Sequence, residues 1–92
     1  MAILSHDDIT AALLDLPGWR FEDSGIVKEF TFAGFPEAAA FVTRLVPGSE
    51  AADHHPDLSV SYRRVTVRFT THSESGVTAK DLAGARMADS CA

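Results

Sequence analysis

The chain has 92 residues, of which 46% are hydrophobic, and it carries a formal net charge of −5 at pH 7. This length and apolar content predict one domain over residues 1–92 with a core of its own. The negative charge disfavours a nucleic-acid partner, because it repels phosphate backbones. No apolar run of ~18 residues and no basic leader stands in the sequence, so neither a membrane span nor secretion is expected. Cys91 is the lone cysteine, which favours a reducing compartment, with the cytoplasm as the expected location.

The first half of the chain predicts two helices separated by a pair of strands. Ser5 followed by Asp8 is an acidic variant of the capping box, and Pro17 with Gly18 ends the helix that it starts. Alternating apolar residues on both sides of a short turn predict an antiparallel strand pair. The expected elements are a helix over 6–15, strands over 19–22 and 26–32, and a helix that starts at 36.

Pro47 and Gly48 fall inside the second predicted helix. An interior proline removes one backbone hydrogen bond and costs about 3 kcal/mol, which predicts a kink or a break. Ser49 is the expected N-cap if the helix restarts, so a short, separate helical turn or a kinked helix is expected over residues 49–54.

The second half predicts two strands, a loop and a last helix. Tyr62 and Arg63 form the short connection at the ends of the two strands, so a tight hairpin and an antiparallel pair are expected. The expected elements are strands over 58–62 and 64–71, a loop over 73–76, a helix starting near 78, and a frayed end from 89. The whole order predicts an α+β fold, with a four-stranded antiparallel sheet and three helices on one face.

Three of the four histidines, His54, His55 and His72, lie within 19 positions of one another. Imidazole can both give and take a proton near neutral pH, so this cluster indicates proton transfer. A structural alternative exists, because His54 and His55 precede Pro56 and would suit the C-terminal end of a helix dipole. A zinc or iron site is a second alternative, although adjacent histidines on a helix point about 100° apart and seldom share one ion.

Seven positions across residues 50–81 form a pattern that resembles the signature of the pterin-4a-carbinolamine dehydratases. They are Glu50, His54, His55, Pro56, Tyr62, His72 and Asp81. The resemblance extends over most of the chain and implies the same α+β fold. It departs from the family at Pro47 and Gly48, where the family runs its helix unbroken.

The resemblance implies dehydration of a 4a-hydroxytetrahydropterin, in recycling of the pterin of aromatic amino-acid hydroxylases. His54 and His72 are then the acid–base pair, His55 orients the substrate, and Glu50 and Asp81 are substrate-binding residues. Trp19 is a further candidate for substrate binding, as an aromatic wall for a flat pterin, and a place in the core is its equal alternative. Asp81 and Glu50 also have a structural reading as first-turn acids of helices, and Tyr62 is expected in the core. No cofactor and no metal are implied, and the expected assembly is a homotetramer or homodimer. The alternative function is a non-catalytic scaffold that binds a protein partner, which the sequence does not identify.

Overall fold

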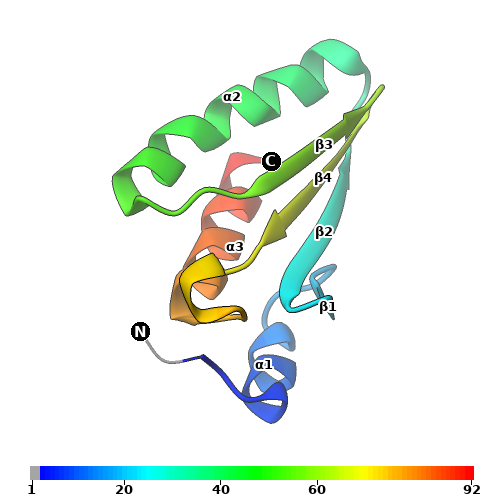
Figure 1. Ribbon diagram of the computed structural model, residues 1–92. Helices are drawn as coiled ribbons and strands as arrows, with labels where there is room; N and C mark the ends of the chain where they lie inside the picture. Colours follow the sequence, from blue (N-terminus) through cyan, green and yellow to red (C-terminus); the bar gives the residue numbers. More distant parts are fainter. Residues whose placement is uncertain (1–2) are drawn as a thin grey trace.

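Figure 1 shows the computed structural model, which describes residues 3–92. Four antiparallel strands form one sheet in the order β1-β2-β4-β3. Their bounds are β1 Arg20–Glu22, β2 Gly25–Thr31, β3 Asp57–Ser61 and β4 Arg64–Phe69. The predicted strands and both predicted hairpins are therefore confirmed, with the fourth strand two residues shorter than expected.

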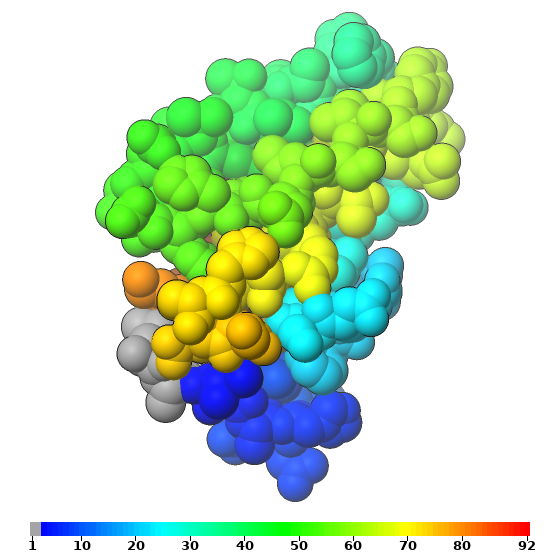
Figure 2. All heavy atoms as spheres, viewed as in Figure 1, coloured from blue at the N-terminus to red at the C-terminus, as the bar shows by residue number. Residues whose placement is uncertain are grey.

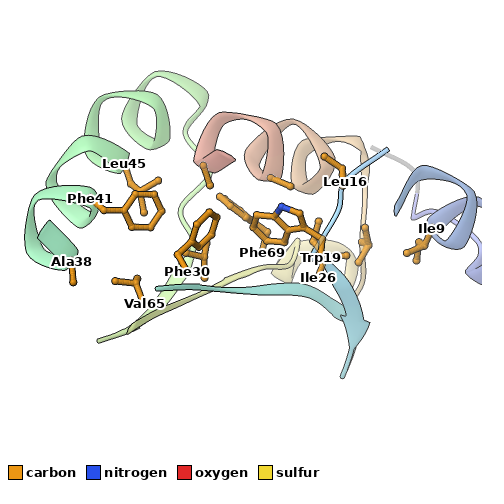
Figure 3. Close-up of a cluster of buried hydrophobic side chains, with 14 residues drawn as sticks. Ile9, Leu16, Trp19, Ile26, Phe30, Ala38, Phe41, Leu45, Val65 and Phe69 are labelled. Carbon is orange, nitrogen blue, oxygen red and sulfur yellow. The ribbon is translucent and has the colours of Figure 1, made fainter. Parts of the chain in front are cut away.

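Three α-helices and one short 3₁₀ helix complete the chain. They are α1 His6–Leu13, α2 Phe35–Ala52, η1 His72–Glu74 and α3 Ala79–Cys91. The α+β element order is therefore confirmed. Figure 3 shows α2 and α3 above the same face of the sheet, whereas α1 lies beyond its end. That all three helices cover one face stays a prediction for α1. Within residues 3–92, no helix is both long and apolar enough to cross a bilayer.

The core fills the space between the sheet and the helices α2 and α3 (Figure 3). Val65, Val67 and Phe69 alternate along β4 and are fully buried, as their period of two predicts. Phe41 and Leu45 of α2 pack onto this face. Burying each such side chain contributes roughly 1.5–3 kcal/mol, so this packing holds α2 against the sheet.

The separate turn expected over residues 49–54 is wrong, because α2 continues from Phe35 to Ala52. The alternative, a kink at Pro47, stays a prediction. Leu45 and Ser49, on either side of Pro47, are both buried, so packing against the sheet outweighs the lost hydrogen bond. Ser49 is not an N-cap, because its hydroxyl donates to the Leu45 carbonyl oxygen at 2.8 Å inside the helix. Gly48 permits close helix packing, since a Cβ there would lie 2.7 Å from Cγ of Met87 on α3.

Two further expectations are corrected at the chain ends and turns. Tyr62 is not a core residue but 70% exposed, because it occupies the β3–β4 turn with a φ of 54°. The end of the chain does not fray, because α3 runs on to Cys91. Asp89 on α3 accepts hydrogen bonds from Trp19 Nε1 at 3.1 Å and from Lys28 Nζ at 2.9 Å, which tie the helix to the sheet.

Candidate functional site

The three clustered histidines meet at one hollow of about 290 Å³. Its lining residues are Asp53, His54, His55, Thr70, Thr71, His72, Ser73 and Lys80. They come from the end of α2, the end of β4 with η1, and the start of α3. Figure 2 shows the yellow segment after β4 next to the green segment after α2, although the two lie far apart in sequence. The expected juxtaposition of His54 with His72 is present.

The end of α2 sets the direction of His54 and His55. Asp53 takes the left-handed conformation with φ 49° and ψ 44°, and the His54 N–H donates to the Ser49 carbonyl oxygen at 3.1 Å. This backbone reversal ends the helix, and Pro56 keeps the chain from resuming it. The two histidines thus leave the helix axis and turn toward β4.

His54 is held by a buried carboxylate. Its Nε2 lies 2.6 Å from Oδ1 of Asp81, and their side chains are 12% and 0% exposed. The imidazole also stacks on the Phe69 ring, with 5.9 Å between centroids and 22° between planes. The contact with Asp81 and the stacking on Phe69 therefore hold the His54 imidazole in one position and one orientation.

Asp81 itself is held by the first turn of α3. Its Oδ2 accepts the Thr78 backbone N–H at 2.8 Å, which completes the predicted capping box, and also the Thr71 hydroxyl at 2.8 Å. The structural reading of Asp81 is confirmed. The same carboxylate faces His54, so one residue both starts α3 and orients an imidazole.

His55 is paired with Glu50 at the surface. His55 Nε2 lies 2.5 Å from Glu50 Oε2, and the side chains are 54% and 68% exposed. An exposed pair of this kind adds only about 0–1 kcal/mol to stability. Glu50 does not line the histidine hollow but a neighbouring apolar groove, which His55 also lines. Glu50 therefore reaches the hollow only through His55.

His72 lies three residues beyond the end of β4, not directly after the strand as expected. β4 ends at Phe69, and His72 is the exposed first residue of η1. It also lines a second, polar hollow beside the first, together with Arg68 and Ser24. The ring is thus more open to solvent than the His54 ring.

Trp19 does not line the hollow. It is 5% exposed, donates its Nε1 proton to Asp89, and packs against Phe69 at 6.2 Å between ring centroids. Phe69 contacts both the Trp19 ring and the His54 ring. Substrate binding by Trp19 stays a prediction.

Lys80 and Thr71 belong to the site but do not belong to the histidine pattern. Lys80 lines the hollow from the first turn of α3, next to Asp81. Thr71 is 7% exposed and bonds to Asp81. Both could have been found from the sequence, because each is the neighbour of a residue of the family signature. Lys80 precedes Asp81, and Thr71 precedes His72.

This arrangement suits acid–base chemistry. A desolvated imidazole on a buried carboxylate and a more exposed imidazole border the same hollow, so two proton-exchanging groups with different surroundings can act on one ligand. Among residues 3–92, no group of three or more His, Cys, Asp or Glu side chains is arranged to hold a metal ion.

The fold and the site define an α+β protein with a histidine-lined hollow backed by a buried aspartate. Residues 2–91 match the model of the pterin 4 alpha carbinolamine dehydratase family, and the chain belongs to that family. Two relatives are provisionally named pterin-4-alpha-carbinolamine dehydratases. The one from Thermosynechococcus vestitus is 51% identical over 86% of this chain and 83% of its own. The one from Metallosphaera sedula is 47% identical over 97% of this chain and 93% of its own.

Two solved structures share the fold of this chain. A transcriptional coactivator/pterin dehydratase from Brucella melitensis is 35% identical and superposes with a TM-score of 0.94 over 99% of both chains. A pterin dehydratase-like protein identified as a RuBisCO assembly factor in the alpha-carboxysome superposes with a TM-score of 0.65. It is 19% identical over 79% of this chain and 84% of its own, so that likeness shows the fold alone.

Proposed function

We propose that this chain removes water from a 4a-hydroxytetrahydropterin such as 4a-hydroxytetrahydrobiopterin, giving the quinonoid dihydropterin. The observation that carries the proposal is the meeting of His54, His55 and His72 at one hollow in a member of this family. The reaction moves protons and breaks one C–O bond, which is chemistry that positioned imidazoles can perform without a redox cofactor.

The proposed step is a paired proton transfer. One imidazole of the His54 and His72 pair protonates the C4a hydroxyl, and the C4a–O bond breaks with its electron pair leaving in water. The N5 lone pair forms the new bond to C4a, and the other imidazole takes the N5 proton. His55, braced by Glu50, orients the ring, and Asp81 acts through His54.

The second candidate function is a non-catalytic scaffold for a protein partner. It is supported by the shared fold of the RuBisCO assembly factor. The His54 imidazole favours the enzyme, because it pairs with the buried Asp81 and also lines the hollow, where a scaffold needs no proton-exchanging group.

The test is the decay of a 4a-hydroxytetrahydropterin, generated by a hydroxylase and followed by ultraviolet absorbance with and without the purified protein. His54→Ala and His72→Ala should each lower the catalysed rate by roughly 10²-fold or more, the usual loss for an acid or base. The matched control is His6→Ala, which should keep the full rate. His6 lies on α1 against Phe21, at 5.6 Å between ring centroids, and does not line the hollow.

Activity should also survive exhaustive chelation, since no step uses a metal. A folded wild-type protein that leaves the spontaneous decay unchanged would reject the enzyme and favour the scaffold. Full rates in both histidine variants would reject their assigned roles. Loss on chelation with recovery on adding one metal would replace the acid–base mechanism by a metal site.

A further inference from the structure

A chain of hydrogen bonds links the start of α3 to the His54 ring through two threonines. Thr71, just after β4, lies with its hydroxyl oxygen 2.8 Å from that of Thr78 and 2.8 Å from Asp81 Oδ2. Asp81 Oδ1 then meets His54 Nε2 at 2.6 Å. Thr71, Thr78 and Asp81 are 7%, 0% and 0% exposed, so bulk water does not compete for these bonds.

The direction of every bond in this chain follows from counting protons. A threonine hydroxyl has one proton to donate. Thr71 donates its proton to Asp81, so the contact between the two hydroxyls requires Thr78 to donate to Thr71. Thr78 is free to do so, because its oxygen accepts the Lys80 backbone N–H at 3.3 Å. Both hydroxyl protons therefore point along the chain toward Asp81.

The Asp81 carboxylate then dictates where the His54 proton sits. Oδ2 receives two donors, the Thr71 hydroxyl and the Thr78 N–H, which together compensate a negative charge. An ionised carboxylate only accepts hydrogen bonds, so the short contact at Oδ1 requires a proton on His54 Nε2. In the neutral ring the other nitrogen, Nδ1, is left without a proton.

We propose that Thr71 is a positioning residue that holds Asp81 ionised and His54 in its Nε2–H tautomer. Nδ1 of His54 is then the nitrogen that exchanges a proton with the ligand, a consequence that rests on the function proposed above. Without the Thr71 hydroxyl, the Thr78 proton loses its acceptor and Asp81 loses a donor. The pair then shifts toward a protonated Asp81 facing an unprotonated Nε2.

The tautomer is measured directly by NMR on ¹⁵N-labelled protein, from the couplings between the ring C–H protons and the two ring nitrogens. In the wild-type protein near neutral pH, His54 should show the Nε2–H pattern. Thr71→Val, which has nearly the same shape but no hydroxyl, should weaken or reverse that pattern, and Thr71→Ser should restore it. Thr70→Val is the matched control for this signal, because the buried Thr70 hydroxyl donates to the Ser24 carbonyl oxygen instead.

Kinetics give the second readout. Thr71→Val should lower kcat by roughly 10- to 100-fold, a part of what a positioned acid or base contributes, and leave KM within about twofold. Thr71→Ser should recover most of kcat. A merely structural role for Thr71 would instead lower the amount of folded protein and leave kcat per folded molecule unchanged.

The outcomes separate this inference from the proposed function. An Nδ1–H pattern in the wild-type protein overturns the inference without any variant, so it stays testable even where Thr71→Val fails to fold. An unchanged Nε2–H pattern and unchanged kcat in Thr71→Val also overturn it. A third outcome is a wild-type Nε2–H pattern that Thr71→Val loses, in a protein that has no dehydratase activity. This outcome would support the role of the Thr71 hydroxyl and reject the proposed function.

Discussion

Asp81 has three donors on two oxygens, and this predicts its response to amidation. Thr71, Thr78 and His54 all donate to it. In Asp81→Asn the amide NH₂ must face at least one donor in a fully buried place. We expect the free energy of unfolding to fall by about 1–3 kcal/mol, the usual penalty for a buried unpaired polar group, and the dehydratase rate to fall with it. Urea denaturation followed by circular dichroism measures the free energy of unfolding.

Asp53→Asn is the matched control for this substitution. Asp53 is exposed and has the left-handed conformation at the C-cap of α2, which asparagine also tolerates. Its stability should therefore stay within about 0.5 kcal/mol of the wild type. Equal losses in both variants would mean that the buried hydrogen bonds of Asp81 add nothing specific.

At the scale of elements, the two prolines of α2 should respond to alanine in opposite directions. Pro47 lies inside the helix and is exposed, so Pro47→Ala regains a hydrogen bond without removing core contacts. Removing the interior proline removes a penalty of about 3 kcal/mol, but alanine also gives the unfolded chain more conformational freedom, which lowers stability. We expect a net gain of roughly 1–2 kcal/mol in the free energy of unfolding, measured by thermal and urea denaturation.

Pro36 provides the comparison within the same helix. It lies in the first turn, where its missing N–H is unpaired anyway. Pro36→Ala should therefore only loosen the unfolded state and lower stability by about 0.4–1 kcal/mol. A loss of stability in Pro47→Ala would show that Pro47 is itself needed to fit α2 onto the sheet.

The two glycines that face other side chains inside helices should also differ. A Cβ at Gly84 would lie 2.6 Å from the ring of Phe69, which is buried and stacks on His54. A Cβ at Gly48 would meet only the flexible side chain of Met87. Gly84→Ala should destabilise by about 1–3 kcal/mol and slow dehydration by shifting Phe69. Gly48→Ala should be nearly neutral in denaturation, and equal effects would contradict the assignment of Phe69 as the rigid neighbour.

Local patterns predicted most of these elements, and long-range contacts account for the failures. The alternation along β4 and the capping box at Thr78 depend on neighbouring residues, and both were predicted. The separate turn predicted after Pro47 was wrong because the helix is held by burial of its inner face, which local propensity does not contain. The end of α3 was misread because its anchors, Trp19 and Lys28, lie far away in the sequence.

The site shows the same division. The clustering of His54, His55 and His72 and the resemblance to the family signature predicted a shared site, and the three do line one hollow. The sequence did not reveal that Thr71 supports Asp81, because that contact joins the segment after β4 to α3. It also could not place Trp19, whose indole turns into the core toward Asp89.

At the scale of the whole molecule, a large apolar surface remains uncovered along α2 and β3. An apolar groove runs between them on the helix side of the sheet, lined chiefly by Val42, Val46 and Leu58. Val46, Leu58 and Val60 are 54%, 39% and 43% exposed. β3 is also an edge strand, since it pairs only with β4 within residues 3–92. An apolar groove beside an open edge is the kind of surface that a second chain covers.

The homo-oligomer expected from the sequence therefore stays a prediction, which we place on this surface. Val60→Lys should dissociate the assembly, because it puts a charge beside the groove on the edge strand. Ser59→Lys is the control, since Ser59 pairs with Thr66 and points to the opposite face of the same strand. Light scattering at micromolar concentration should give a dimer or tetramer for the wild type and Ser59→Lys, and a smaller species for Val60→Lys. A monomeric wild type would reject the oligomer, and an intact assembly in Val60→Lys would move the interface away from β3.

Since His55 lines both the groove and the histidine hollow, dissociation should also change the dehydratase KM.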